Sequence, residues 1–316
     1  MDLFVVTFES VAVLLGIGLI GYWIIRKRIL NANDLGLLSP LALDVALPSL
    51  IFTRIATDFS LNEYPDWWQL PIWWCFFTLI VALLTFVFMY ISKKEYRSEF
   101  GLSLFYQNAL FFPLAIIAGI YPSEGKYLVY LFFFTLFFPA FFFSTYSIFF
   151  KTKQKFKIDL KKIFHPVLIV TLVAIFIVLL GLKGNIPNIV ISISALLGAM
   201  TVPLIMIILG GNIYLDFHKK GKIQYFEIIK FVLIKNFLFP LIFLGIIISI
   251  KSALSFHVAL ILLIQSAVPP VTTVPLVTER AGGNRSIVNQ FIISSFISSL
   301  ISIPIMIYLF ELFYVT

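Results

Sequence analysis

Two polar stretches interrupt long apolar runs of this sequence, one in each half of the chain, and both combine side-chain amides or hydroxyls with proline. They lie at residues 107–113 and 265–273. Proline removes a backbone donor, and hydrocarbon offers no water to the groups that it frees. Interrupted membrane helices at corresponding positions of two halves point to the binding site of a transporter. The residues expected to bind a substrate are Gln107, Asn108, Pro113, Gln265, Pro269, Pro270, Thr272 and Thr273.

The chemistry that these stretches could perform is the binding of a small anion. A helix that is broken inside the membrane presents a new N-terminus, whose free amides and dipole attract a carboxylate, while unwound carbonyls can accept a cation. Side-chain amides and hydroxyls add further donors and acceptors. A single proline could instead do no more than kink a continuous helix. Because both halves carry proline beside amides, the sequence favours a binding site over two kinks.

Two ionisable side chains also lie inside apolar runs. Asp44 stands four residues before Pro48, and Lys235 stands five residues before Pro240. A charge at the bilayer centre costs about 2.5–3.5 kcal/mol on insertion scales, so each should face the helix bundle and find a partner or titrate. For Asp44 the hypotheses are a proton- or cation-coupling residue and a structural hydrogen-bonding residue. Lys235 could snorkel, neutralise an anionic substrate or, as we favour, form an ion pair, with Asp44 as one candidate partner.

The elements that must position these residues are membrane-spanning helices. The 316 residues are 61% hydrophobic and 12% charged, with a mean hydropathy of +1.05. Apolar runs of about 20 residues recur along the chain, which predicts an all-α polytopic membrane protein. The first run starts at Leu3 without a basic region or cleavage site, so we expect a retained helix. The ten expected segments are 3–25, 36–57, 67–91, 100–121, 127–150, 163–182, 187–214, 224–250, 257–278 and 287–313.

Basic residues alternate between the loops of this arrangement. One side of the membrane has only Lys126, Lys183 and Lys251 in its loops. The positive-inside rule puts the more basic side in the cytoplasm, with both termini outside the plasma (inner) membrane. The net charge of +8 therefore reflects topology and contact with membrane lipids, and no nucleic-acid partner is expected. The 17 basic residues of the cytoplasmic side are Arg26, Lys27, Arg28, Lys93, Lys94, Arg97, Lys151, Lys153, Lys155, Lys157, Lys161, Lys162, Lys219, Lys220, Lys222, Arg280 and Arg285.

A basic connector divides the chain into two halves of five segments each. The expected domains are a first repeat at 1–150, the connector at 151–162 and a second repeat at 163–316. An odd number of segments per half makes the second half enter the membrane with the opposite orientation. Any repeat must therefore be inverted.

Weak internal similarity supports a repeat of this kind. Residues 47–52 are similar to residues 202–207 at an offset of 155 positions, and Gln107 corresponds to Gln265 at an offset of 158. Each glutamine is followed by proline and then by a loop that contains glycine. Chance could produce one such match, but the matches agree in order and spacing. We therefore predict two inverted five-helix repeats.

Several short patterns along the chain are similar to those of one transporter family. In chain order they are Leu43–Phe52, Phe112–Ala115, Gly198–Leu204 followed by Gly210, Lys235 followed by Pro240, Pro269–Thr273 and Gly282–Asn284. Each pattern alone is short, but their order and spacing extend over nearly the whole chain. Together they resemble the auxin efflux carrier family of membrane transporters.

The resemblance implies ten helices in two inverted five-helix repeats, with broken fourth and ninth helices that cross at mid-membrane. It also implies transport of organic anions, which in this family include dicarboxylates such as malate and the indole carboxylate auxin. Some positions depart from the family pattern. Tyr106 stands where the family often has asparagine, Thr272 and Thr273 replace an asparagine that often follows the ninth-helix proline, and Asp44 also stands where asparagine is usual. These departures leave the substrate open.

The first functional hypothesis is a secondary active transporter that moves a small organic anion by alternating access, with a proton or sodium ion as candidate coupling ion. A channel is disfavoured because no filter sequence is present. Two further hypotheses are a transporter-fold sensor or receptor and a membrane-embedded enzyme. No enzyme activity, metal site or cofactor is expected, because the chain has one cysteine, Cys75, three scattered histidines and no phosphate loop, zinc motif or catalytic constellation. A homodimer is one option for its assembly.

Overall fold

The computed structural model describes residues 3–121, 125–150, 166–217 and 223–315, and over these ranges the chain is helical without any strand. Seven helices are long and apolar enough to cross a membrane, and three shorter apolar helices accompany them. The seven coincide with seven of the ten predicted segments, and the three shorter helices fall in the fourth, sixth and ninth. The prediction of an all-α polytopic membrane protein is confirmed at this level. The connector 151–162 lies outside the described residues.

The described residues form α-helices with three π-helical segments, η1 in the first half and η5 and η7 (Glu311–Val315) in the second. The first-half elements are α1 (Leu3–Arg26), α2 (Ala32–Pro40), η1 (Leu41–Ala46), α3 (Leu47–Asp58), α4 (Gln69–Phe88), α5 (Arg97–Phe105), α6 (Phe111–Ile120), α7 (Lys126–Phe134) and α8 (Phe138–Thr145). The second-half elements are α10 (Pro166–Leu179), α11 (Asn188–Ala199), α12 (Thr201–Phe217), α13 (Tyr225–Val232), η5 (Leu233–Leu238), α14 (Phe239–Ser249), α15 (Phe256–Ala267), α16 (Val274–Arg280) and α17 (Arg285–Phe310).

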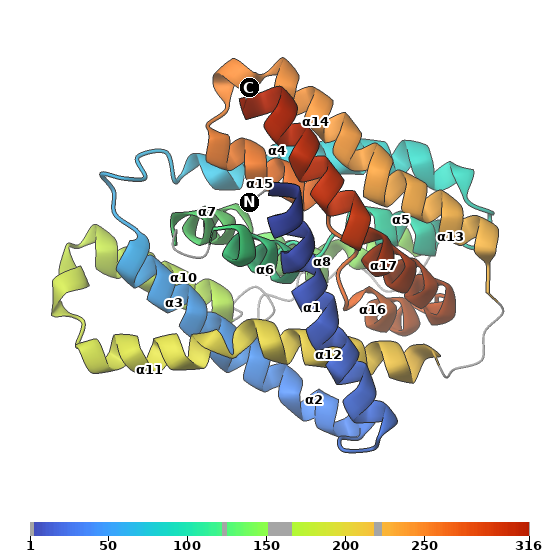
Figure 1. Ribbon diagram of the computed structural model, residues 1–316, viewed down its shortest axis with the longest axis horizontal. Coiled ribbons are helices and arrows are strands. Elements are labelled where there is room, and N and C mark those ends of the chain that lie inside the picture. Colours follow the sequence, from blue (N-terminus) through green and yellow to red (C-terminus); the bar gives the residue numbers. More distant parts are fainter. Residues whose placement is uncertain (1–2, 122–124, 151–165, 218–222, 316) are drawn as a thin grey trace.

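The helices pack in two groups, and each group takes helices from both halves of the chain. In the first group, α1, α2, α3, α10, α11 and α12 pack against one another, most extensively α1 against α12. In the second group, α4, α5, α7 and the helices from α13 to α17 pack together. Figure 1 shows most of the first group in the lower part of the molecule and most of the second in the upper part. Helices α6 and α17 both pack on α1, so the boundary between the groups runs along α1.

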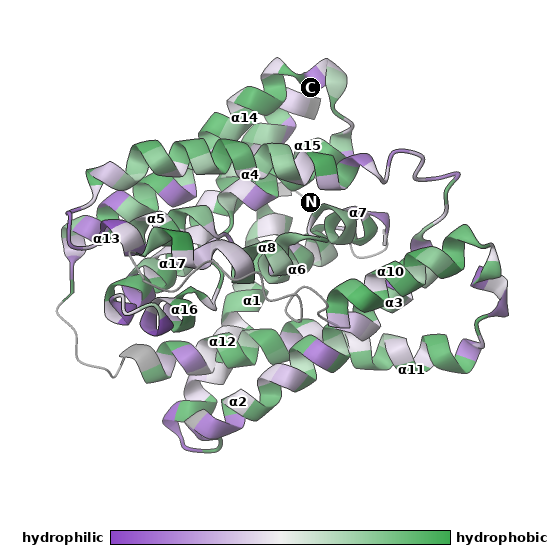
Figure 2. Cartoon of the chain, turned by 180° about the vertical axis from the view of Figure 1, so that it is seen from behind, coloured by the Kyte–Doolittle hydropathy of each residue, from purple (hydrophilic) through white to green (hydrophobic). Residues whose placement is uncertain are grey.

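Hydrophobic residues cover most of the helical surface, as Figure 2 shows, and hydrophilic residues gather in the loops and around α16. Many large apolar side chains are exposed on the outer helices, among them Leu79 on α4 and Leu196 on α11, which are 60% and 75% exposed. In water such a surface would drive aggregation, whereas in a bilayer it faces lipid of matching polarity. The exposed apolar surface thus agrees with a membrane environment.

The close packing of α1 on α12 depends on glycine. A side chain at Gly210 would collide with the carbonyl group of Gly18, and a side chain at Gly21 would collide with the backbone of Ile207. Small residues let the backbones of two membrane helices approach each other closely, which gains van der Waals contact where lipid offers no hydrophobic driving force. The α1–α12 pair is therefore a tightly joined part of the first group.

The π-helical segments η1 and η5 each end directly before a proline-containing turn. The amide of Leu47, which precedes Pro48, donates to the carbonyl of Ala42, and the amide of Phe239, which precedes Pro240, donates to the carbonyl of Ile234. Each bond spans five residues instead of four. Proline lacks the donor that a regular α-helix needs at its position, and the wider turn accommodates the lost bond. The two π-segments therefore follow from the two prolines.

Candidate functional site

The two breaks that the sequence singles out lie side by side and are joined by backbone hydrogen bonds. Gln107 and Pro270 form an isolated antiparallel bridge. The amide of Asn108 donates to the carbonyl of Pro269 at 2.8 Å, and the amide of Val271 donates to the carbonyl of Tyr106 at 2.9 Å. The helix breaks and their prolines would leave backbone donors and acceptors without partners in hydrocarbon. Here some of these groups form hydrogen bonds with one another. We call this pairing of residues 106–110 with residues 268–273 the crossing.

The two glutamines at the crossing hold it together through buried hydrogen bonds. The side-chain amide of Gln265 donates to the carbonyl of Ala109 at 2.6 Å, and its oxygen accepts from the amide of Gln107 at 3.4 Å. Gln265 and Gln107 are 0% and 3% exposed. Buried amides whose donors and acceptors pair across an interface fix its geometry, because breaking them leaves polar groups without partners. These glutamines hold the two breaks together, and neither of them lines the two larger cavities beside the crossing.

Asn108 caps the helix that follows the first break. Its side-chain oxygen accepts from the amides of Phe111 and Phe112, at 3.2 and 3.4 Å, in the first turn of α6. Pro113 lies inside this first turn, where its missing donor costs nothing, so the break precedes the proline. The expectation that a substrate would meet free amides at this helix start is therefore wrong for α6. The side-chain nitrogen of Asn108 is buried and has no acceptor in the described part of the chain.

The second break leaves its donors available. Val268 is extended, with φ −73° and ψ 150°, as expected before a proline, and α15 ends there. Prolines 269 and 270 continue the break, and α16 begins at Val274. Among the described residues, the backbone amides of Thr272 and Thr273 have no hydrogen-bond acceptor, and both side chains are half-buried. This break can donate backbone and hydroxyl hydrogen bonds to a ligand.

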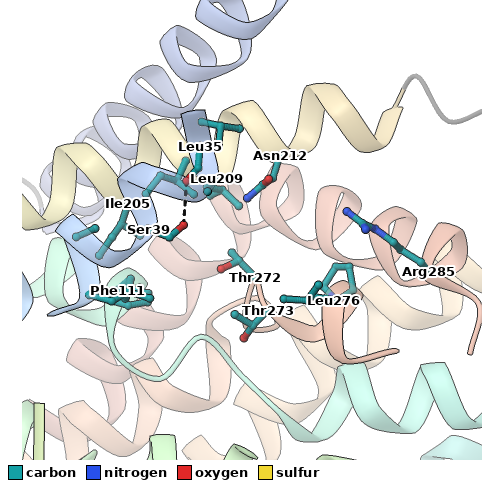
Figure 3. Close-up of a pocket in the computed structure, with 15 residues that line it drawn as sticks. Leu35, Ser39, Phe111, Ile205, Leu209, Asn212, Thr272, Thr273, Leu276 and Arg285 are labelled. Carbon is teal, nitrogen blue, oxygen red and sulfur yellow. Dashed lines mark hydrogen bonds between the residues drawn. The ribbon is translucent and has the colours of Figure 1, made fainter. Parts of the chain in front are cut away.

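Two of the cavities that adjoin the crossing share part of their lining. The larger, of about 300 Å³, lies between α2, α12, α16 and the start of α17, and Figure 3 shows Ser39, Asn212 and Arg285 around it. The smaller, of about 100 Å³, is lined by Asn108 and by aromatic side chains of α8. The residues common to both cavities are Leu43, Phe111, Thr272 and Thr273. The threonine pair thus stands between a polar cavity and an apolar one.

The electrostatics of the two cavities favour an anion. Of the described residues that line them, Arg285 is the charged one and none is acidic. Arg285 forms an ion pair with Glu279, which is largely exposed. The carboxylate of Glu99 accepts from the amide of Asn284 at 2.7 Å and so holds the start of α17, where Arg285 lies. An arginine at a partly buried site without a lining carboxylate can bind a carboxylate group of a ligand.

Comparison with known families decides what kind of protein this geometry belongs to. A family model described as membrane transport protein matches residues 6–307, nearly the whole chain. The chain belongs to this family. The prediction of membership in the auxin efflux carrier family is confirmed, and the protein is a multi-pass membrane transporter. A comparison with curated proteins found none that matches the chain.

The two charged residues predicted to act in coupling lie outside the cavities of this transporter. Lys235 is in η5 and 1% exposed, and its ammonium group lies 5.7 Å from the ring centroid of Phe239. No carboxylate among the described residues forms an ion pair with Lys235, so the favoured ion pair with Asp44 is not present. The side-chain amide of the neighbouring Asn236 donates to the carbonyl of Ser295 in α17, and its oxygen accepts from the hydroxyl of Ser295. These two hydrogen bonds join η5 to α17 in the buried interior.

Asp44 is exposed, although it was expected to face the interior of the bundle. It lies in η1, and the extra residue of a π-turn rotates the preceding side chains by about 100° relative to a regular helix. Its neighbours Ala42 and Leu43 take the inward positions and line the larger cavity. Asp44 is therefore not buried in the bundle as expected, because the residue pattern shows the proline but not the π-turn that precedes it.

Several residues of the transporter's cavities were not anticipated as site residues. Ser39 and Asn212 line the larger cavity, and Phe138 and Phe142 line the smaller one. Asn212 carried a usable signal, because an amide inside an apolar run of α12 costs free energy unless it has a polar role. The phenylalanines carried none, since their run along the chain is equally typical of packing and lipid contact. Arg285 had been assigned to topology alone.

Proposed function

We propose that this transporter is a secondary active carrier that moves a small organic anion, such as a carboxylate, by alternating access. The observation that carries the proposal is the crossing itself. Two broken helices are bonded to each other at residues 106–110 and 268–273, and the donors left over, Asn108 Nδ2 and the amides of Thr272 and Thr273, adjoin cavities with no acidic lining. Unpaired donors in a low-dielectric site stabilise negative charge.

The balance of donors and acceptors separates an anion from a cation. A cation site would need carboxylates, or carbonyl oxygens left free by the breaks. Here the carbonyls of Tyr106, Ala109 and Pro269 already accept hydrogen bonds within the crossing. The donors Asn108 Nδ2 and the amides of Thr272 and Thr273 remain available, no carboxylate lines the two cavities, and Arg285 is the nearby positive charge. We therefore favour a carboxylate over a cationic substrate.

The position of the larger cavity supports alternating access. It lies between helices of the first group, α2 and α12, and helices of the second group, α16 and α17. Its lining residues stand close in sequence to the basic loops that end at Arg28 and contain Arg280. With the basic side in the cytoplasm and both termini outside, this conformation is open inward. A shift of one group against the other would close this cavity and open the opposite side.

The finer features of the proposal are the architecture and the coupling. We propose ten membrane helices in two inverted five-helix repeats, 1–150 and 163–316, in the plasma membrane. A proton or sodium ion is the candidate driving ion, and Asp44 remains the candidate residue for a coupling role because it adjoins cavity-lining Leu43. Lys235, buried beside the ring of Phe239, is proposed to have a structural role in the second group.

Counterflow in proteoliposomes tests the proposal. Vesicles containing the full chain are loaded with unlabelled substrate and diluted into trace radiolabelled substrate, using malate, other dicarboxylates, an indole carboxylate and the cation choline. Transient accumulation of a labelled anion above equilibrium is the expected result, because only alternating access exchanges an inner for an outer substrate molecule.

Two other results would each contradict a part of the proposal. Accumulation of choline but of no anion would overturn the carboxylate assignment. Failure of every compound to accumulate, in vesicles whose protein remains folded by its thermal unfolding curve, would overturn the carrier and favour a sensor or an enzyme built on this fold.

A further inference from the structure

A third cavity lies away from the crossing, at the boundary between the two helix groups. It measures about 410 Å³ and is enclosed by α1 and α12 of the first group and by α17 of the second. Its lining is apolar except for the hydroxyl of Tyr22. Gly18 and Gly210, where the backbones of α1 and α12 touch, both line it. The missing side chains at this contact explain why space remains beside it.

The cavity opens sideways toward the surrounding hydrocarbon. Leu19 on α1 and Ile297 on α17, which both line it, are 68% and 64% exposed. Water is disfavoured in such a space because it offers almost no polar partner, and an empty space would forfeit the dispersion contacts of its lining. In a bilayer the available filling is a lipid acyl chain.

The same face of α1 leads from the cavity to a cluster of positive charge. Gly18 and Tyr22 line the cavity, and Arg26 follows Tyr22 by four residues, which places it one turn further along the same face. Arg26, Lys27 and Arg28 are all exposed at the end of α1. A lipid whose acyl chain occupies the cavity would therefore bring its headgroup to these basic residues.

We propose that this cavity and the basic end of α1 form a binding site for one anionic phospholipid. The acyl chain fills the space between α1, α12 and α17, and the phosphate contacts Arg26 and Lys27. Each basic residue near an anionic headgroup contributes about 1 kcal/mol, which distinguishes an anionic from a zwitterionic lipid. Since the cavity spans the boundary between the two groups, the bound lipid contacts both of them and couples lipid composition to their relative position.

Lipid retention by the full chain tests the site. The purified protein is exposed to an equimolar mixture of phosphatidylglycerol and phosphatidylcholine in detergent, and bound lipid is counted by native mass spectrometry. The expected result is one preferentially retained phosphatidylglycerol. In the double variant R26Q/K27Q, its occupancy relative to phosphatidylcholine should fall about thirtyfold, because two favourable charges are lost. The matched control is K93Q/K94Q, which removes two exposed charges from another loop of the same side.

A second variant tests the acyl-chain cavity independently of the charges. At Gly18 an added Cβ would meet only the carbonyl oxygen of Met206, at an ordinary 3.8 Å, so Gly18→Leu should fill the cavity without disturbing the α1–α12 contact. This variant should lose the retained lipid although Arg26 and Lys27 are intact. If it fails to fold, Leu300→Trp fills the same space from α17.

The proposal is overturned by either of two results. One is equal phosphatidylglycerol retention in R26Q/K27Q and K93Q/K94Q. The other is unchanged lipid retention in a folded cavity-filling variant.

Discussion

The two breaks of the crossing look alike in sequence but differ in what their polar groups do. At the first break, the backbone amide of Asn108, its side-chain oxygen and the side chain of Gln107 all have partners within the protein. At the second break, the amides of Thr272 and Thr273 have no acceptor among the described residues, and their side chains reach both cavities. Both breaks contribute to the hydrogen bonds of the crossing, but the first leaves only the side-chain nitrogen of Asn108 as an unpaired donor, whereas the second also leaves two backbone amides beside the cavities.

The difference between the two breaks follows from the residues that each break contains. The first break contains no proline, so its backbone can bond across the crossing, and asparagine supplies the cap for α6. The second break has two consecutive prolines, which cannot donate, and its threonines follow them after a single valine. Two breaks that look alike in sequence therefore leave different groups unpaired. Substitutions that remove a hydrogen bond of the crossing and substitutions that remove a group facing the cavities should separate the two roles.

The largest effect is expected from Gln265→Leu, which removes the side chain that bonds to both Ala109 and Gln107. Leaving these buried groups without partners should cost about 1–3 kcal/mol of stability. The melting temperature in detergent should fall, and counterflow should be lost. Ser266→Ala is the matched control, since the Ser266 hydroxyl bonds only within its own helix, to Leu263. A Gln265→Leu protein with normal stability and transport would show that the glutamines do not hold the joint.

A different signature is expected from the double variant Thr272→Val and Thr273→Val. The hydroxyls make no hydrogen bond within the described part of the protein, so stability should be retained. Substrate affinity should fall about two- to tenfold for each lost hydrogen bond, seen as a raised KM for uptake. Thr278→Val, a buried threonine of α16 that lines neither cavity, serves as control. An unchanged KM would remove the threonines from the substrate site.

A smaller effect is expected from Arg285→Gln. Arg285 lines the larger cavity, but its charge is partly compensated by Glu279 and partly exposed to solvent. The KM for an anionic substrate should rise about two- to fivefold at low salt, and the difference should shrink as ionic strength increases. Arg280→Gln removes one exposed charge from the neighbouring turn and controls for surface potential. Equal effects of both substitutions would mean that Arg285 acts only through long-range charge.

The smallest effect on counterflow is expected from Asp44→Asn, which lies outside both breaks. If Asp44 carries the coupling proton, uptake driven by a pH gradient should lose its pH dependence, whereas counterflow, which needs no gradient, should persist. Uptake at several external pH values measures this. Asp66→Asn, an exposed residue of the α3–α4 loop, is the control. Unchanged pH dependence in Asp44→Asn would exclude Asp44 as the coupling residue.

The membrane environment explains why so much was predictable. Hydrocarbon requires every backbone group to be satisfied within the protein, so apolar length marks the helices, and proline beside amides marks their breaks. The predicted breaks at 107–113 and 265–273 contain the residues that meet at the crossing. The short patterns from Leu43–Phe52 to Gly282–Asn284 also indicated the family that a match over residues 6–307 shows.

The fate of individual polar groups was not predictable in the same way. Gln265 bonds to a carbonyl 156 residues away, and Asn212 and Arg285 meet around one cavity from different helices. Asp44 turned outward because a π-turn before Pro48 changed the helix face. Such outcomes depend on how helices from both halves pack, and residue spacing along one helix does not contain that information.

The sequence by itself determined that this chain is a membrane transporter with two interrupted helices, because the physics of the bilayer acts locally on each apolar segment. The tertiary structure alone decided which polar groups of the two breaks pair across the crossing and which stay unpaired beside the cavities. The pairing depends on hydrogen bonds between segments that lie far apart in the chain. A donor that is paired across the crossing is no longer available to a substrate.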